Sequence, residues 1–411
     1  MKWERKTIND LCEIKGGKRL PKNHELIEVE TNHPYIRARD IGNGIIDFSK
    51  PVYLQENTFN FISRYTVKAD DIVMTIVGAN IGDVGIIPKH LDGANLTENA
   101  VKLTSFNENC HFKYLLYYFL LPGKKKQLEQ VAAGSAQGKL GLYKIKDIEV
   151  PIPPLPTQRR IASILSAYDD LIENNIKRIK LLEEKAQLHY KELMQEMSYS
   201  KTKREEYIKD CLAFYIGGGW GEEDYKEGFT QPAFVIRGTD IPDAKKGEVK
   251  GVPFRYHKES NLASRSMQAG DIVFEVSGGS KGQPVGRSIL ITEKMLQQFG
   301  KPVMCASFCK MLRPNENVTP EFFYLYLLAS HENGVIAQYE KHSASNIVNY
   351  GFEEFIGEQK ITIPKESELR AFTEKVKPIF TLISTLGEQN TKLREARDIL
   401  LPRLMNGEIE V

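Results

Sequence analysis

Residue types that perform catalysis occur in this chain, but not at the spacings that catalytic motifs require. The glycine-rich segment 278–286 lacks the Gly-x4-Gly-Lys-Ser/Thr order that cradles a phosphate. The eight histidines are dispersed, without the His-x-His or His-Glu-x-x-His spacing of a metal site. Glu183-Glu-Lys185 matches only the short carboxylate–lysine end of a nuclease motif, a pattern that charged helices produce by chance. We therefore predict no catalytic residues, no cofactor and no metal in this chain.

Two further motifs are incomplete. The Pro153-Pro154 pair has neither the preceding Asp or Asn nor the following aromatic residue of an adenine-methylating loop. The five cysteines form an odd, scattered set, and Cys305-x3-Cys309 lacks the second pair that a zinc site needs. The cysteines are typical of small residues in a reducing cytosol. A non-enzymatic role is expected.

Length and composition set the class of protein. A chain of 411 residues with 41% hydrophobic and 27% charged content is typical of a globular protein of two or three domains. The longest apolar run, residues 114–121, is too short to cross a bilayer, and no secretory signal opens the sequence. We expect a cytoplasmic protein. The 56 basic and 54 acidic residues give a net charge of +2, which neither supports nor excludes DNA binding.

An internal repeat organises the elements that carry these residues. Tyr35-Ile-Arg-Ala-Arg-Asp-Ile41 returns as Val235-Ile-Arg-Gly-Thr-Asp-Ile241, and Asp71-Ile-Val-Met74 returns as Asp271-Ile-Val-Phe274. Further along the chain the offset grows from 200 to 208 and then 211, but the order of the matches never changes. The chain is therefore predicted to be a duplication of a unit of about 200 residues.

The first part of each unit mixes short β-rich runs with Gly- and Asn-rich turns. Each also contains one helix with apolar residues on both sides, at 112–121 and 320–329. Two mixed α/β (α+β) globular domains are predicted, at 1–154 and 201–365.

The second part of each unit, 155–200 and 366–411, predicts a long helix. Thr157 is a plausible N-cap of the first helix, while Pro378 and Pro402 predict a kink or a late start in the second. Apolar residues recur in steps of three and four, as in a coiled coil. The seam residues are Ile161, Leu165, Ile172, Asn175, Ile179, Leu182, Phe372, Val376, Ile383, Asn390, Leu393 and Leu404.

The two apolar stripes can be buried if the helices pair with each other. We expect an antiparallel coiled coil, with the two units related by a pseudo-twofold axis. Asn175 and Asn390 would then lie inside the seam, where a buried Asn costs stability but fixes register and orientation; the alternative places both at its edge.

The duplicated pattern of a globular domain followed by a long helix resembles the specificity subunit of type I restriction–modification systems. The resemblance covers essentially the whole chain. Its most specific segments are Gly134-Ser-Ala-Gln137, Ile152-Pro-Pro-Leu-Pro-Thr-Gln-Arg-Arg-Ile161 and Leu401-Pro-Arg-Leu-Met-Asn-Gly-Glu408. In the second unit Lys365-Glu-Ser-Glu-Leu369 replaces Pro154-Leu-Pro-Thr-Gln158, which leaves open whether both helices dock partners identically.

The resemblance implies a non-catalytic subunit of a bacterial or archaeal restriction system. Its two target recognition domains would each read one half of a bipartite double-stranded DNA site, and its helices would set the gap between the halves. The helices would also dock two modification subunits, which bind S-adenosylmethionine and methylate adenine. Separate restriction subunits, ATP- and Mg-dependent translocases and nucleases, would join through the complex.

Candidate DNA contacts come first from a basic loop. Lys15, Lys18, Arg19 and Lys22 surround two glycines, which suits close approach to a DNA backbone; the alternative is a solvated basic loop.

Other candidates come from comparing the repeats. Arg37 and Arg39 alternate with apolar residues and are predicted on one face of a strand. Arg237 retains the first arginine, which we interpret as structural and paired with Asp40 or Asp240, whereas Thr239 replaces Arg39 and is the better candidate for specificity. The remaining candidates are polar or basic loop residues: Ser135, Gln137, Lys139, Lys281, Ser343, Ser345 and Asn346.

A second hypothesis from another class stays open at this stage. A coiled-coil scaffold whose globular domains bind proteins instead of DNA would also fit the repeat, and the near-zero net charge slightly favours it. A neighbouring gene for an adenine methyltransferase would separate the two hypotheses.

Overall fold

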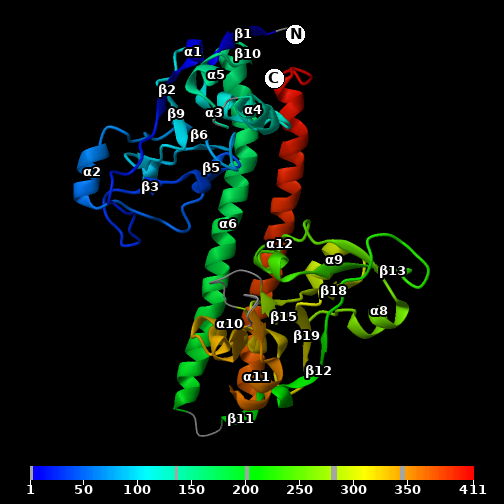
Figure 1. Ribbon diagram of the computed structural model, residues 1–411. Helices are drawn as coiled ribbons and strands as arrows, with labels where there is room; N and C mark the ends of the chain where they lie inside the picture. The colour runs from blue at the N-terminus through cyan, green and yellow to red at the C-terminus, as the bar shows by residue number, and fades with distance from the viewer. Residues whose placement is uncertain (1–2, 135–137, 200–202, 279–284, 343–347) are drawn as a thin grey trace. The chain divides into compact units, whose positions relative to one another are not determined.

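The computed structural model describes residues 3–134, 138–199, 203–278, 285–342 and 348–411 (Figure 1). The chain forms two compact units. The first contains Met1–Asp170 together with Glu395–Val411, and the second contains Leu171–Arg394.

The first unit is built on a four-stranded antiparallel sheet in the order β2-β9-β6-β7. A short parallel pair, β3 with β8, and an antiparallel pair, β1 with β10, complete its main strands. The strands are β1 (Glu4–Thr7), β2 (Glu13–Gly16), β3 (Tyr35–Ile36), β4 (Ile41–Gly42), β5 (Ile45–Ile46), β6 (Ile72–Thr75), β7 (Val84–Ile86), β8 (Asn95–Leu96), β9 (Ala100–Thr104) and β10 (Glu149–Ile152). The helices are α1 (Ile8–Leu11), η1 (Ala38–Asp40), α2 (Glu56–Ile62), η2 (Lys89–Leu91), α3 (Phe112–Phe119), α4 (Lys124–Ala133) and α5 (Leu142–Lys146).

The second unit repeats this topology. Its sheet has the order β12-β19-β15-β17, β13 pairs in parallel with β18, and β11 pairs with β22. The strands are β11 (Arg204–Tyr207), β12 (Leu212–Gly217), β13 (Gln231–Ile236), β14 (Phe254–His257), β15 (Ile272–Glu275), β16 (Ser277–Gly278), β17 (Ser288–Leu290), β18 (Val303–Cys305), β19 (Cys309–Pro314), β20 (Glu340–His342), β21 (Val348–Tyr350) and β22 (Lys360–Ile363). The helices are η3 (Ile208–Cys211), η4 (Gly238–Asp240), α7 (Ile241–Ala244), α8 (Glu259–Arg265), α9 (Glu293–Phe299), α10 (Pro320–Glu332), η5 (Ile336–Tyr339) and α11 (Phe352–Glu358).

The buried residues explain these elements. All four residues of β6 and all four of β15 are buried, because each strand lies in the middle of its sheet with covered faces. The helix α3 is buried from Tyr114 to Phe119, which accounts for its apolar residues on both sides. The mixed α+β fold class predicted from the sequence is confirmed.

The long helices are α6 (Leu155–Ser198) and α12 (Glu366–Met405) (Figure 1). In the first unit the start of α6, with Ile161 and Leu165, shares a core with Leu404 at the end of α12. In the second unit the later half of α6, with Leu193, shares a core with Phe372 at the start of α12. Within each unit the two helices therefore run antiparallel, as predicted.

The predicted seam residues face the interior of their units. Asn175 donates from Nδ2 to Oδ1 of Asn390 over 3.0 Å, and both side chains are buried. Of the other seam residues, Leu182 and Leu393 are half-buried and the rest are buried.

Two expectations about where the long helices begin were wrong, the N-cap of the first and the late start of the second. The first helix begins at Leu155, so Thr157 is not its N-cap; Pro156 lies in the first turn, where the missing N–H would have no partner anyway. The second helix begins at Glu366 and continues through Pro378. Pro378 has no N–H, so the carbonyl of Glu374 lacks its helical donor. Glu374 is exposed, so water can donate a hydrogen bond to that carbonyl instead.

Two kinds of feature are absent from the described residues. No helix there combines the length and apolar content needed to cross a membrane. Within the same ranges, no three His, Cys, Asp or Glu side chains gather as they would around a metal ion.

Candidate nucleic-acid interface

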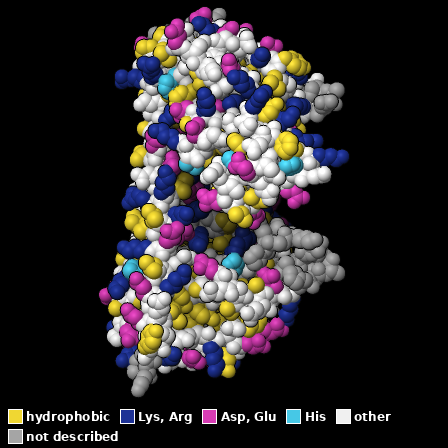
Figure 2. Space-filling model, turned by 90° about the vertical axis from the view of Figure 1, so that its left-hand side faces the viewer, with side chains coloured by type: hydrophobic (Ala, Val, Ile, Leu, Met, Phe, Trp, Pro, Cys, Tyr) yellow, Lys and Arg dark blue, Asp and Glu magenta, His cyan; other side chains and the backbone are white. Residues whose placement is uncertain are grey.

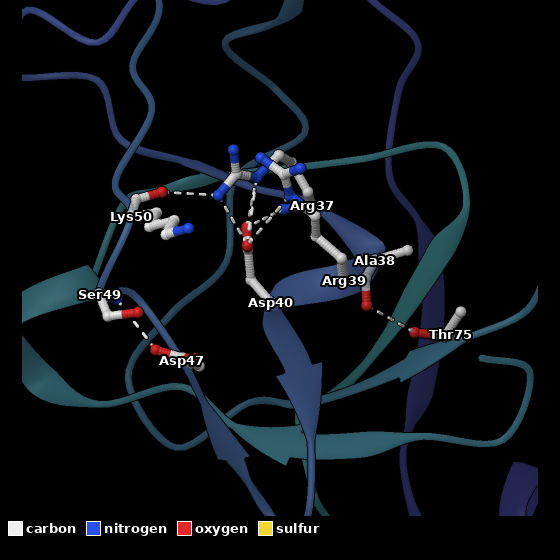
Figure 3. Close-up of polar contacts among 8 residues, drawn as sticks. All are labelled: Arg37, Ala38, Arg39, Asp40, Asp47, Ser49, Lys50 and Thr75. Atoms are coloured by element: carbon white, nitrogen blue, oxygen red, sulfur yellow. Dashed lines mark hydrogen bonds and ion pairs between the residues drawn. The ribbon is translucent and has the colours of Figure 1, made fainter. Parts of the chain in front are cut away.

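The first repeated motif, around Arg37, forms a tight turn. Asp40 accepts hydrogen bonds from the Arg37 backbone N–H at 2.8 Å, from Nε at 2.9 Å and from Nη2 at 2.8 Å (Figure 3). Arg37 Nη2 also donates to the carbonyl of Lys50 at 2.6 Å. The expectation that Arg37 and Arg39 lie on one strand face was wrong, because β3 ends at Ile36 and residues 38–40 form the 3₁₀ helix η1.

The second unit builds the same turn. Asp240 accepts from the Arg237 backbone N–H at 2.8 Å, from Nε at 2.9 Å and from Nη2 at 2.7 Å. The hydrogen bond to Asp240 raises the pKa of Arg237. The pairing predicted for the retained arginine is present in both units, so this residue holds the turn in shape.

The middle of the turn differs between the units. Arg39 is exposed over 69% of its side chain, and its Nε lies 4.0 Å from the nearer carboxylate oxygen of Asp40 (Figure 3). Thr239 occupies the equivalent position and is also exposed. An identical scaffold thus presents a cation in one domain and a small hydroxyl in the other.

In the basic loop, two cations have acidic partners. Lys15 lies 2.5 Å from Glu13, and Arg19 Nε donates to Glu98 over 2.9 Å. Lys18 Nζ lies 5.5 Å from the centroid of the Tyr65 ring, and Lys22 is exposed.

One of the two glycines of this loop serves the protein's own backbone. A Cβ on Gly17 would lie 2.0 Å from the carbonyl oxygen of Thr97, and one on Gly218, its counterpart, 2.2 Å from that of Ala306. The close approach that Gly17 permits is therefore internal, whereas a Cβ on Gly16 would meet nothing within 4 Å.

The end of β6 gathers several candidates. Thr75, its last residue, donates from Oγ1 to the carbonyl of Ala38 at 3.4 Å, and Val77 pairs with Lys139. Arg39 and Lys139 therefore flank the same sheet end. The candidates Ser135, Gln137, Lys281, Ser343, Ser345 and Asn346 lie outside the described residues.

Sequence reasoning missed an ion pair at the matching end of β15. Arg287 donates from Nε and Nη2 to the two carboxylate oxygens of Glu275 at 2.7 and 2.5 Å, and Glu275 is 2% exposed. The hydrogen bond to Glu275 raises the pKa of Arg287. A Cβ on Gly238 would lie 2.3 Å from Glu275 Oε1, so this carboxylate packs directly against η4.

Two of the segments that carry the family resemblance have internal roles, and the third, 134–137, lies mostly outside the described residues. Gln158 is fully buried: its Oε1 accepts from the His111 backbone N–H at 2.9 Å, and its Nε2 donates to the carbonyls of Asn109 and Pro153, each at 2.8 Å. At the other end of the chain Gly407, with φ +70°, closes α12 against Trp3. These two segments join the helices to the first domain.

Charge is mixed on the visible surface. On the face drawn in Figure 2, Lys and Arg side chains are interspersed with Asp and Glu over the described residues. DNA recognition on this face would therefore depend on a few placed cations.

Comparisons with known proteins show what the chain resembles in sequence and in fold. Residues 1–184 match the model of the type I restriction modification DNA specificity domain. Over its whole length the chain is 24% identical to the putative type I restriction enzyme MjaX specificity subunit of Methanocaldococcus jannaschii, and 26% identical to the type I restriction enzyme MjaIX specificity subunit of that organism; it covers 94% of each.

A solved structure shares the fold. The type I restriction–modification S subunit of M. genitalium is matched with a TM-score of 0.58 at 16% identity, over 98% of this chain and 96% of that one. The match of residues 1–184 to a DNA specificity domain favours DNA recognition over a scaffold that binds proteins. Over its whole length the chain is similar in sequence to type I restriction–modification specificity subunits, and it shares the fold of one that has been solved.

Proposed function

We propose that the two recognition domains, at 1–154 and 201–365, each read one half of a bipartite double-stranded DNA site. The helical segments 155–200 and 366–411 set the number of unread base pairs between the halves. The observation that carries this proposal is one topology built twice, with different exposed side chains, Arg39 and Thr239, on the same rigid turn. Repeated scaffolds with divergent exposed residues suit two readers of different bases.

The helices also dock two modification subunits. Leu171 on α6 and Leu382 on α12 are 211 positions apart, as are Leu188 and Ile399, and all four side chains are exposed. These exposed apolar residues at matching places on the two helices support two equivalent binding sites for one kind of partner. The partners are adenine methyltransferases that bind S-adenosylmethionine, and ATP- and Mg-dependent restriction subunits join through the complex.

The altered segment in the second unit changes the exposed residues at the start of its helix. Leu369, which occupies the place of Gln158, is buried like that residue, whereas residues 365–368 are exposed. The two docking sites therefore differ in exposed residues at the helix starts.

Methylome sequencing tests the bipartite site. Residues 1–154 are exchanged for the corresponding domain of another family member, in a strain that carries the modification partner. The exchange should change one half of the methylated site and leave the other half and the gap unchanged. A change in both halves, or a continuous site, would contradict the proposal.

A second experiment tests the helices as the spacer. Four residues are inserted after Asp170 in α6 and four after Arg394 in α12, at the chain positions where the two units divide. Each helix gains about 6 Å at about 1.5 Å per residue, so the gap should grow by about one or two base pairs of about 3.4 Å. The bases read in each half should stay the same. An unchanged gap would show that the helices do not set the spacing.

A further inference from the structure

Three arginine–carboxylate forks lie in the second unit. Arg237 pairs with Asp240, Arg313 with Asp271, and Arg287 with Glu275, each through Nε and Nη2. Two of their carboxylates also have basic partners in the first unit: Asp40 pairs with Arg37, and Asp71 lies 3.5 Å from Lys102, two positions before the residue that matches Arg313. Features kept in both units serve the shared fold.

The third fork has no counterpart. The backbone N–H of Glu275 donates to the carbonyl of Arg287 at 2.9 Å, and that of Thr75 donates to the carbonyl of Asp83 at 2.9 Å. Gly286 directly precedes Arg287 with φ +88°, and Gly82 directly precedes Asp83 with φ +87°. The two hairpins therefore match at their bases, with Arg287 in the place of Asp83 and Glu275 in the place of Thr75.

The first unit shows that the fold does not need this ion pair. Asp83 pairs instead with Lys125 of α4, at 2.7 Å, and Thr75 contacts Ala38. A buried ion pair contributes little to stability relative to well-packed neutral side chains. The second unit nonetheless buries Glu275 and uses Gly238 where the first has Ala38, which makes room for the carboxylate.

Among the described residues, the fork leaves part of the Arg287 guanidinium without a hydrogen-bond partner. An arginine has five N–H donors, and Glu275 takes two of those of Arg287. The Arg287 side chain is 31% exposed, beside the turn that carries Thr239. A buried carboxylate that fixes an exposed guanidinium pre-orients its outer N–H groups for a pair of acceptors.

We propose that Arg287, held by Glu275, is a specificity-determining residue of the second recognition domain and reads a guanine in that domain's half of the site. Guanine offers O6 and N7 as a paired acceptor in the major groove, which matches an arginine fork. In the first domain the exposed Arg39 lies at the same sheet end, so each domain places one differently anchored arginine there. This inference rests on the proposed bipartite function.

The experiment uses the full complex of the chain with its modification partner, once methylome sequencing has given the site. Binding is measured to duplexes in which each base pair of the site is changed in turn. The wild-type complex should discriminate by about 5- to 150-fold against changing one G·C pair in the half read by the second domain. Arg287→Lys keeps the charge but loses the fork, so discrimination at that pair should approach 1 while the other pairs are unaffected.

Arg313→Lys is the matched control. Arg313 forks onto Asp271 at 2.7 Å and its side chain is 30% exposed, but its carboxylate partner is kept in both units. The Arg313→Lys variant should discriminate between base pairs as the wild type does at every position of the site. If Arg287→Lys folds poorly, the double variant Glu275→Gln/Arg287→Gln removes both charges together and should show the same selective loss.

Several outcomes would overturn the proposal. The first is that Arg287→Lys discriminates between base pairs as well as the wild type does. The second is an equal loss of affinity at all positions, as loss of a phosphate contact would give. The third is that the half-site read by the second domain contains no G·C pair. The proposed function itself would be contradicted by a different result, in which the wild-type complex recognises a continuous site. A bipartite site that Arg287→Lys leaves unaltered refutes only the role of Arg287.

Discussion

The two units attach their recognition domains to the long helices by opposite chemistry. In the first unit Tyr117 of α3 donates its hydroxyl to Asp169 of α6 at 2.5 Å, and Arg397 of α12 donates to the same carboxylate at 2.6 Å. Burial raises the pKa of Tyr117, so its proton stays on the hydroxyl and in this hydrogen bond.

The equivalent positions of the second unit are apolar. Leu325 of α10, Phe380 of α12 and Ala186 of α6 stand where Tyr117, Asp169 and Arg397 stand in the first unit. Leu325 and Ala186 are buried, and Phe380 packs on the same core. One fold thus accepts either a charged network or an apolar contact at the same place, and the two should respond differently to substitution, salt and pH.

The largest expected effect is on the apolar contact. Leu325→Ala should lower the free energy of unfolding of the second unit by about 2–5 kcal/mol, because it removes a buried side chain and leaves a cavity. Hydrogen–deuterium exchange of peptides from each unit measures this, with the exposed Leu382→Ala as control. A loss no larger than that of the control would mean that Leu325 does not anchor the domain.

The charged network should give a smaller effect that depends on salt. Asp169→Asn removes the charge that Arg397 pairs with, but the two side chains are 35% and 24% exposed, so water screens the pair. We expect a loss of about 1 kcal/mol in the first unit at about 0.05 M salt, shrinking at about 0.5 M. Phe380→Leu, the matched change in the second unit, should show no salt dependence. Equal salt dependence of the two variants would remove the contrast between the units.

Much of this architecture could be predicted from the sequence, because periodicity and repetition are local signals. The steps of three and four along α6 and α12 located the buried residues of both helices, including Asn175 and Asn390. The repeat of Arg37 as Arg237 indicated a retained pairing with the nearby aspartate.

The candidate site was harder to predict. The alternation of polar and apolar residues around Arg37 resembles that of a strand. However, the Asp40 carboxylate accepts a hydrogen bond from the Arg37 backbone N–H, and this local bond favours a turn over pairing with a neighbouring strand. The equivalence of Arg287 with Asp83 was hidden because the hairpin shifts the offset between the repeats to 204. Only the backbone hydrogen bonds of the two hairpins reveal it. The role of Gly17 depends on the backbone near Thr97, which is 80 positions away in the sequence.

The pair of asparagines is the polar exception in the seam of the second unit. Asn390 Nδ2 is buried without a hydrogen-bond partner among the described residues. Replacing both Asn175 and Asn390 with Leu should therefore raise the free energy of unfolding, by about 1 kcal/mol, at a loss of register control. Thermal unfolding measures the gain, with Ile179→Leu as a control for repacking. A fall in stability would mean that the amide pair stabilises the seam.

The smallest expected effect concerns pH. His257 at the end of β14 is 1% exposed, and burial lowers its pKa below the usual 6.5. A lowered pKa means that the folded protein keeps this ring neutral while the unfolded chain takes up a proton, so its contribution to stability is present above pH 6.5 and is lost as pH falls below it. Between pH 7 and pH 6 that loss is at most about 0.7 kcal/mol for one group with an unfolded pKa of about 6.5. His257→Leu should reduce the pH dependence of exchange in the second unit over this range and leave the part due to His331, whose pKa burial also lowers.

The first unit, in which burial also lowers the pKa of the half-buried His111, serves as the internal reference and should keep its pH dependence in the variant. A variant whose second unit loses as much stability between pH 7 and pH 6 as the wild type would contradict the prediction that burial keeps His257 neutral.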